Sequence, residues 1–387
     1  MDKRTKIIAT ISDKRCEVEF IRSLYEAGMN AVRINTAHVT TRSAATIVEN
    51  VRRVSEKIAI IIDTKGPEIR LTGMAAGFES GIPIEKGQLV RMKGTAEDRP
   101  SSDQTIYLND PTIYDAVPTG SIILIDDGEL ELQVVDKTDD ELVCEVHNGG
   151  VIKPRKSVNI PGVPIDLPSV TDKDHEFINW AIDMDIDFIA HSFVRKKSDV
   201  LAVKKILKDR NSSIKIISKI ENSEGVDNID EILDETYGIM VARGDLGVEI
   251  PAERIPVTQR LLVKKCIESK KPVIIATQML HTMIEHPRPT RAEISDVANA
   301  IYQRVDAVML SGETANGLYP VEAVATMARV AREIENDEVN NGPNIDMNLV
   351  RINNEITAQL ARSAVRASIN LRVKAIVIDT LSGRTGR

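Results

Sequence analysis

Eight short apolar segments run along the chain, each ending at a charged or hydroxyl residue, and most are followed by a stretch of helical periodicity. They cover residues 6–12, 31–35, 58–64, 187–193, 214–221, 238–245, 272–278 and 307–313. Near-continuous apolar runs are typical of parallel strands that are covered on both faces. Eight strands alternating with helices predict an α/β fold of the (β/α)8 or TIM-barrel type, in which functional residues lie at the carboxyl ends of the strands.

Several of the intervening stretches carry apolar residues at helical spacing. They predict helices at 16–28, 198–208, 257–267 and 321–334. Gly28 is expected to end the first of these as a C-cap. Thr290 is expected to cap a further helix, with Glu293 completing a capping box.

The link between the third strand, which ends near residue 64, and the helix expected at 172–184 far exceeds an ordinary βα loop of about 2–6 residues. It contains short β-like pieces separated by Gly and Pro, without a long helical period. This pattern predicts an inserted all-β domain at 67–163, between two parts of the barrel at 1–66 and 164–344. An insert after the third strand is expected to form a lid over the barrel mouth.

Residues after 344 follow a polar linker and predict a helix over 353–371 and a strand over 374–380. We interpret 345–387 as the start of an α/β C-terminal domain, because so short a stretch rarely folds alone. The alternative is a self-sufficient piece docked on the barrel. We expect a fragment of a larger protein, with exposed apolar surface near 376–378.

Composition narrows the class of protein. The 387 residues suggest two or three domains, and the net charge of −8 argues against nucleic acid or an anionic membrane as a partner. No apolar run reaches the roughly 18 residues of a membrane span, and the first residues lack the features of a signal peptide. Three scattered cysteines favour neither a disulfide framework nor a zinc site. A cytoplasmic protein is the expectation.

Charged pairs mark the ends of two neighbouring strands. Alternation along a strand places Lys219 and Glu221 on one face, and we expect Arg243 and Asp245 to share a face on the next strand. Two carboxylates from adjacent strand ends suit a hard divalent cation such as Mg2+. Lys219 beside them would neutralise phosphate charge. The alternative is a salt-bridge network that closes the barrel mouth.

Other strand ends add anion and cation ligands. Arg33 suits bidentate binding of phosphate or carboxylate, and Gly244 lets backbone N–H groups approach an anion, although a plain tight turn is the alternative. Thr277 can relay a proton or bind a carboxylate, or it can simply cap a helix. A second, monovalent cation would find an oxygen-rich set in Asn35, Asp63 and Thr64.

Several segments jointly resemble the pyruvate kinase family, and the resemblance runs from residue 3 to the last residue. These segments are DTKGPEIR (63–70), KIENSEG (219–225), ARGDLG (242–247), ATQML (276–280), HPRPTRAE (286–293) and MLSGETA (309–315). The family has a barrel, a β-rich domain inserted after its third strand, and a C-terminal domain, in agreement with the segmentation above. The resemblance implies phosphoryl transfer from phosphoenolpyruvate to ADP, giving pyruvate and ATP in the last step of glycolysis.

The resemblance also implies a role for each matching residue. Glu221 and Asp245 would ligate Mg2+ (or Mn2+), Lys219 would stabilise the phosphoryl group in flight, and Arg33 would bind it. Amides around Gly244 and Asp245, with Thr277, would hold the substrate carboxylate, and Thr277 would join the proton path. The implied K+ ligands are Asn35, Asp63 and Thr64. The implied contacts to ADP or ATP are Arg70, Lys156, Asp127 and His38.

Two features qualify the match. Ala37 stands where the family usually has a serine that binds K+, whereas Glu68 matches the members that need K+. The family implies a homotetramer, but the short C-terminal part argues against that assembly for this chain. Two other functions stay open: an inactive, truncated chain that binds phosphoenolpyruvate, and a Mg2+-dependent aldolase of 2-oxo acids on the same kind of barrel.

Overall fold

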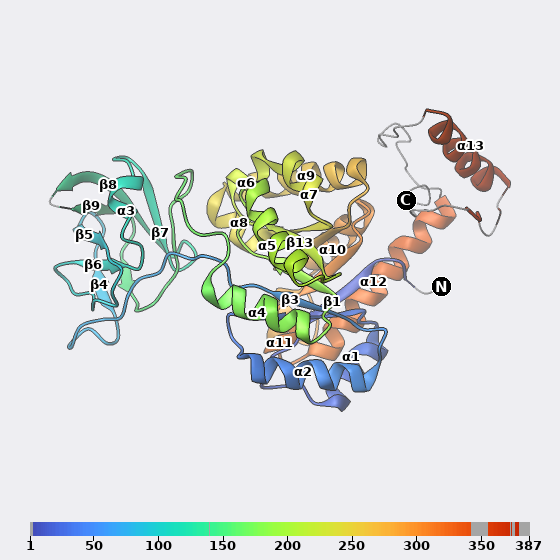
Figure 1. The fold of residues 1–387 in the computed structure, drawn as a ribbon, viewed down its shortest axis with the longest axis horizontal. Coiled ribbons are helices and arrows are strands. Elements are labelled where there is room, and N and C mark those ends of the chain that lie inside the picture. The colour runs from blue at the N-terminus through green and yellow to red at the C-terminus, as the bar shows by residue number, and fades with distance from the viewer. Residues whose placement is uncertain (1–2, 139, 342–354, 372, 374–375, 379–387) are drawn as a thin grey trace.

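A closed barrel of eight parallel strands forms the centre of the computed structural model, which describes residues 3–138, 140–341, 355–371, 373 and 376–378 (Figure 1). The (β/α)8 prediction is confirmed. In their order around the barrel, the strands are β1 (Lys6–Thr10), β16 (Ala307–Leu310), β15 (Val273–Ala276), β14 (Gly238–Ala242), β13 (Lys215–Ile220), β12 (Phe188–His191), β3 (Ala59–Asp63) and β2 (Ala31–Asn35).

The two faces of these strands belong to different hydrophobic clusters. Ile8, Ile61 and Ile217 belong to a small cluster that fills the barrel interior, whereas neighbours such as Ile7 and Ile60 belong to the large cluster under the surrounding helices. Successive side chains of a strand point to opposite faces, so both faces must be apolar when both are covered. This explains the continuous apolar runs in the sequence.

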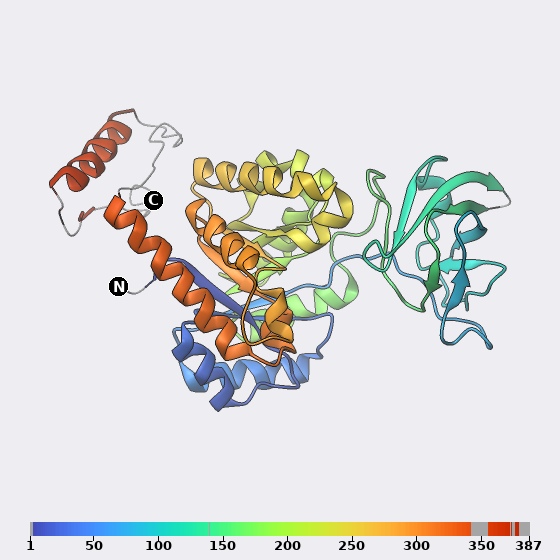
Figure 2. The same cartoon turned by 180° about the vertical axis from the view of Figure 1, so that it is seen from behind.

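Helices surround the barrel as an outer layer (Figure 2). They are α1 (Val18–Ala27), α2 (Thr41–Val54), α4 (Asp172–Asp183), α5 (Lys197–Asp209), α6 (Ser223–Asp227), α7 (Ile229–Glu235), α8 (Arg243–Glu249), α9 (Ile255–Ser269), α10 (Arg291–Tyr302), α11 (Gly312–Ala315) and α12 (Pro320–Asn341), with 3-10 turns η1 (Ala252–Arg254) and η2 (His281–Ile284). The predicted C-cap Gly28 has φ 120° and donates its N–H to the last turn of α1. Thr290 and Glu293 form the predicted capping box of α10.

The segment between β3 and α4 forms a separate β-rich body beside the barrel, with a hydrophobic core of its own (Figure 1). Its main sheet has the order β11 (Val158–Asn159), β7 (Ile122–Ile125), β8 (Leu130–Thr138), β9 (Glu141–Val146), β5 (Leu89–Gly94) and β6 (Ile106–Leu108), and β10 (Gly150–Ile152) pairs with β4 (Ile82–Ile84). We call this body, residues 67–163, the lid. It also contains one short helix, α3 (Ile113–Ala116), which the expectation of an all-β insert did not include.

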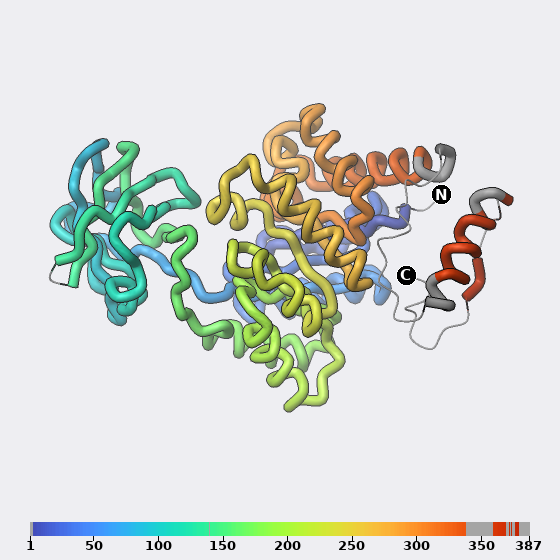
Figure 3. Tube along the Cα trace, turned by 90° about the horizontal axis from the view of Figure 1, so that it is seen from above, coloured from blue at the N-terminus to red at the C-terminus, as the bar shows by residue number. Residues whose placement is uncertain are grey.

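The C-terminal helix α13 (Glu355–Leu371) stands apart from the barrel, beyond the end of α12 (Figure 3). The strand expected at 374–380 lies largely outside the described residues, and its described part, 376–378, is not in a strand. Within that part Val377 is 96% exposed, so the expected apolar surface is confirmed. None of the helices in the described ranges is both long and apolar enough to cross a membrane.

Candidate active site

Polar residues at the strand ends continue the inward face of the barrel. On four strands, an interior apolar residue is followed two positions later by a polar one: Ile8 by Thr10, Ala31 by Arg33, Ile61 by Asp63 and Ile217 by Lys219. Because positions i and i+2 share a face, the same alternation that fills the barrel with apolar side chains delivers these polar groups to its mouth.

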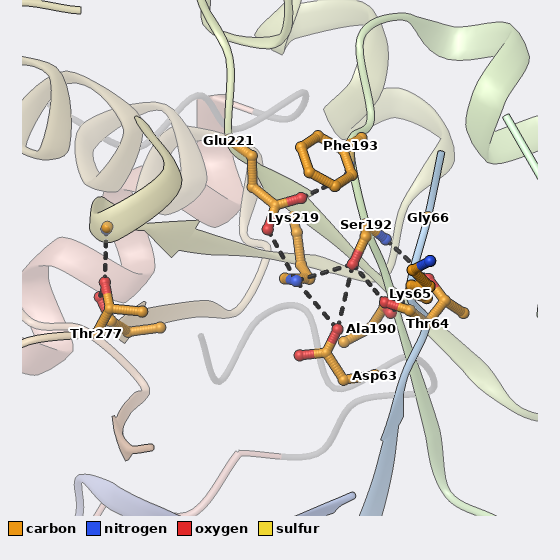
Figure 4. Close-up of polar contacts among 12 residues, drawn as sticks. Asp63, Thr64, Lys65, Gly66, Ala190, Ser192, Phe193, Lys219, Glu221 and Thr277 are labelled. Carbon is orange, nitrogen blue, oxygen red and sulfur yellow. Dashed lines mark hydrogen bonds and ion pairs between the residues drawn. The ribbon is translucent and has the colours of Figure 1, made fainter. Parts of the chain in front are cut away.

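Lys219 is the centre of a buried network at this mouth (Figure 4). Its Nζ lies 2.8 Å from Glu221 Oε1, 3.0 Å from Asp63 Oδ1 and 2.8 Å from Ser192 Oγ. Burial alone would lower the pKa of Lys219, but the negative charges of Asp63, Glu221 and Asp245 raise it above its ordinary value. The lysine therefore stays charged within the barrel.

Asp63 joins the two cations of the mouth. Its Oδ2 accepts from Arg33 Nε at 2.6 Å while its Oδ1 faces Lys219, and Arg33 also donates to Thr10 Oγ1 at 3.1 Å. Burial would raise the pKa of Asp63, but the charges of Arg33 and Lys219 bring it below the ordinary value. An ionised Asp63 thus fixes Arg33 and Lys219 side by side.

Glu221 and Asp245 form the candidate divalent-cation site. Glu221 accepts the N–H of Phe193 at 2.6 Å and pairs with Lys219. Burial, together with the charge of Asp245, raises the pKa of Glu221 to about 7, although Lys219 opposes this rise. Two hard carboxylates close enough to repel each other suit a divalent cation, which would hold both in the ionised form. Among the described residues no group of three or more His, Cys, Asp or Glu side chains is arranged for a metal.

The expected pairing of Arg243 with Asp245 on one strand face is wrong. Strand β14 ends at Ala242, and α8 begins at Arg243. Residues two positions apart in a helix are separated by about 200° around its axis, so the side chains of Arg243 and Asp245 point in different directions. Arg243 donates to the carbonyl oxygen of Thr277 at 2.7 Å and pairs with Asp296 at 2.8 Å, away from the candidate metal site.

Thr277 is held in an unusual backbone conformation across the mouth from Lys219 (Figure 4). Thr277 and Gln278 have φ values of 68° and 54°, and such left-handed geometry is strained for a β-branched residue. The Thr277 hydroxyl accepts the N–H of Gly244 at 2.7 Å and donates to the Ala276 carbonyl at 2.7 Å. The hydroxyl is thereby fixed where two strand ends meet the interior.

A cleft of about 360 Å³ separates the lid from the barrel mouth. It is lined by Asp127 of the lid, by Asp245 of the candidate metal site, and by Phe193 and Asn222 from neighbouring strand ends. Each of the two bodies therefore contributes residues to the cleft, and a ligand bound in it would contact both.

Comparison with known proteins accounts for this arrangement. The family model for the pyruvate kinase barrel domain matches residues 2–324. This chain belongs to the pyruvate kinase family.

Individual relatives agree with the family assignment. A pyruvate kinase of Borreliella burgdorferi is 49% identical, with 100% of this chain and 80% of the relative covered. One from Geobacillus stearothermophilus is 47% identical, and this chain spans 66% of its length. The crystal structure of a pyruvate kinase from Cryptosporidium parvum superposes with a TM-score of 0.89 at 39% identity, over 99% of this chain and 80% of that one.

The residues that the family resemblance assigns to nucleotide are dispersed. Asp127 lines the cleft, where it accepts from Ser157 Oγ at 2.9 Å. Lys156 pairs with Asp126 at 2.8 Å, Arg70 pairs with Glu68 at 2.7 Å, and His38 is exposed. Of the four candidates, only Asp127 is among the cleft-lining residues, and the nucleotide roles of all four stay predictions.

The K+ candidates lie together but are already hydrogen-bonded. Asn35 is the register partner of Asp63 on the neighbouring strand, and its side-chain oxygen accepts the N–H of Ala37 at 3.0 Å. Thr64 Oγ1 accepts the N–H of Ser192 at 3.0 Å. Asp63, Asn35 and Thr64 thus offer adjacent oxygens, and a cation there would compete with Arg33 and Lys219 for Asp63.

Sequence reasoning missed two residues of this network. Ser192 and Phe193 follow β12 and contact Lys219 and Glu221 respectively. The available signal was a hydroxyl residue near the end of a mainly apolar segment, a feature that Thr64 and Thr277 share. Nothing in the sequence showed that Phe193 has a φ of 54° or that its N–H donates to Glu221.

Proposed function

We propose that this chain transfers the phosphoryl group of phosphoenolpyruvate to ADP, giving pyruvate and ATP in the last step of glycolysis in the cytoplasm. The observation that best supports this function is the buried Lys219, which is held between Asp63 and Glu221 at the barrel mouth. Asp245 and the lid residue Asp127 line the cleft beside it. Because this chain spans 66% to 80% of its relatives, the activity of the whole proteins is proposed for it.

Phosphoryl transfer needs positioning and charge neutralisation more than covalent help. The bond between phosphorus and the enol oxygen breaks, an oxygen of the ADP β-phosphate bonds to phosphorus, and the enolate takes a proton at its methylene carbon. Arg33 and Lys219, fixed side by side through Asp63, supply two positive charges for the phosphoryl oxygens. Neither group has to move far, because Asp63 holds both in advance.

Glu221 and Asp245 would hold Mg2+ (or Mn2+). When bound, this cation neutralises phosphate charge and orients the substrate oxygens. The raised pKa of Glu221, caused by burial and by the charge of Asp245, supports a cation between them. Asn35, Asp63 and Thr64 would hold K+ close to Arg33, where one ligand is absent because residue 37 is alanine.

Thr277 and the first turn of α8 would bind the substrate carboxylate. The Gly244 N–H, now donated to Thr277 Oγ1, points into the same region, so a carboxylate there would share or replace this bond. The fixed Thr277 hydroxyl would hold the water that delivers the proton. From the lid, Asp127, Lys156 and Arg70, together with His38 of the barrel, would contact the nucleotide, and closure of the lid would exclude water.

The test is coupled pyruvate formation from phosphoenolpyruvate and ADP with Mg2+, with and without K+. We expect turnover that needs K+ and that falls about 1000-fold in Lys219→Met. A folded protein that shifts its melting temperature with phosphoenolpyruvate and Mg2+ but forms no pyruvate would support the inactive-chain alternative. Pyruvate released without nucleotide would favour an aldolase.

A further inference from the structure

Ser192 lies in the centre of the buried network, yet neither the strand pattern nor the family resemblance gave it a role. It follows β12 directly and is 1% exposed. Its Oγ accepts from Lys219 Nζ at 2.8 Å, and it lies 2.6 Å from the Thr64 carbonyl oxygen and 3.2 Å from Asp63 Oδ1 (Figure 4). One hydroxyl thus connects the ends of three strands.

The orientation of this hydroxyl is determined by its neighbours. A serine hydroxyl has one proton to donate and lone pairs to accept with. The shorter distance assigns the proton to the Thr64 carbonyl, which cannot donate in return. The lone pairs are then directed toward Lys219, which carries only donors. Ser192 is therefore a fixed, uncharged acceptor for the lysine.

The backbone around Ser192 is locked as well. Its N–H donates to Thr64 Oγ1 at 3.0 Å. Gly66 has φ 70°, and a Cβ there would lie 2.8 Å from the side chains of both Ser192 and Phe193, so glycine is needed for the close packing. The serine therefore cannot shift without moving the end of β3.

The ammonium of Lys219 has three donors, and the structure supplies three acceptors: Asp63, Glu221 and Ser192. A phosphoryl oxygen needs one of these donors. Two of the acceptors are carboxylates that attract the lysine wherever it lies nearby, whereas a neutral hydroxyl acts only over hydrogen-bond distance and direction. The hydrogen bond with Ser192 therefore restricts the position of Lys219 Nζ more narrowly than the two carboxylates do.

We propose that Ser192 is a positioning residue that holds Lys219 in line with the transferred phosphoryl group. This inference rests on the proposed phosphoryl transfer and adds a residue to it. Ser192 touches no substrate in this scheme and acts only through Lys219.

The experiment compares Ser192→Ala with Ser218→Ala in the full chain. Ser218 is a matched control because it is equally buried and adjacent to Lys219 in sequence, but its hydroxyl donates to Thr236 on the outer side of the barrel. We expect Ser192→Ala to lower kcat about 10- to 100-fold, as for loss of a hydrogen bond to a charged group, with KM for phosphoenolpyruvate changed less than about threefold. Ser192→Thr, which keeps the hydroxyl, should recover most of kcat; Ser192→Cys, which keeps the volume with a weak acceptor, should not.

Two further readouts separate positioning from a structural role. Melting temperatures should fall by similar amounts in Ser192→Ala and Ser218→Ala, while only the former loses kcat. In a Lys219→Met background, adding Ser192→Ala should change the residual turnover less than about twofold, because the residue acts through the lysine.

Contrary outcomes are equally distinct. Equal kcat for Ser192→Ala and Ser218→Ala, or a further tenfold loss in the Lys219→Met background, would overturn the positioning role alone. Absence of phosphoryl transfer in the wild-type protein would overturn the proposed function first, and the inference with it.

Discussion

Two lysine–aspartate pairs of similar length lie in opposite surroundings. At the barrel mouth Lys219 and Asp63 are 3.0 Å apart, with side chains 10% and 1% exposed. In the lid Lys156 and Asp126 are 2.8 Å apart, with side chains 37% and 28% exposed. The distances alone suggest interactions of equal strength. Burial, however, removes the solvent screening that weakens a surface pair, and it also makes an unpaired charge costly.

The comparison indicates what each region can do. The mouth is a closed network in which Arg33, Asp63, Lys219 and Glu221 depend on one another, so its charges are held in place before any ligand arrives. Separating the lid pair costs little free energy, so Lys156 would be free to leave Asp126 for a phosphate of the proposed nucleotide. We infer that the charged groups of the barrel mouth are preorganised, whereas those of the lid can rearrange when a ligand binds.

The largest expected effect tests this difference directly. Asp63→Asn removes the charge that balances Arg33 and Lys219 and should lower the free energy of unfolding by about 3–5 kcal/mol. The matched lid variant, Asp126→Asn, should cost less than about 1 kcal/mol. Urea unfolding followed by the fluorescence of Trp180, the single tryptophan, reports on the barrel, and hydrogen exchange of lid amides reports on the lid. Equal costs for the two variants would contradict the comparison.

The sequence predicted those features that follow from periodicity. Alternation along β13 placed Lys219 and Glu221 on one face, and their ion pair confirms it. The same reasoning failed at Arg243 and Asp245, because the apolar run carries no mark where the strand gives way to helix α8. Alternation also cannot show a contact between strands that are distant in sequence, so it did not predict that Ser192 contacts the end of β3.

A second prediction concerns a buried histidine of the barrel. His191 is fully buried on the outer side of β12, and neither ring nitrogen meets hydrogen-bond geometry with any described residue. Burial lowers its pKa below the ordinary value, and the charges of Asp174, Asp199 and Glu221, together with the nearby backbone of Asp199, only partly oppose this. The unfolded chain therefore binds a proton near pH 6.5 that the folded chain does not, and stability falls as pH drops below that value.

The variant His191→Leu removes this titration. Its free energy of unfolding relative to wild type should increase as the pH falls from 8 to 5, by up to about 1.4 kcal/mol per pH unit below pH 6.5. Urea unfolding at both pH values checks it. A difference between variant and wild type that does not change with pH would mean that His191 is protonated equally in both states.

The smallest effect compares backbone strain in the two regions. Gln278 at the mouth and Asp127 in the lid have nearly equal φ values, 54° and 55°. Aspartate tolerates left-handed geometry better than glutamine, because its short side chain can bond to the local backbone. Gln278→Gly should therefore raise the free energy of unfolding by up to about 1 kcal/mol, and Asp127→Gly by less than about 0.5 kcal/mol. Thermal unfolding of both variants measures the difference. If Gln278→Gly is more stable and yet turns over more slowly, the strained backbone at the mouth contributes to the orientation of Thr277; if turnover is unchanged, the strain has no part in turnover.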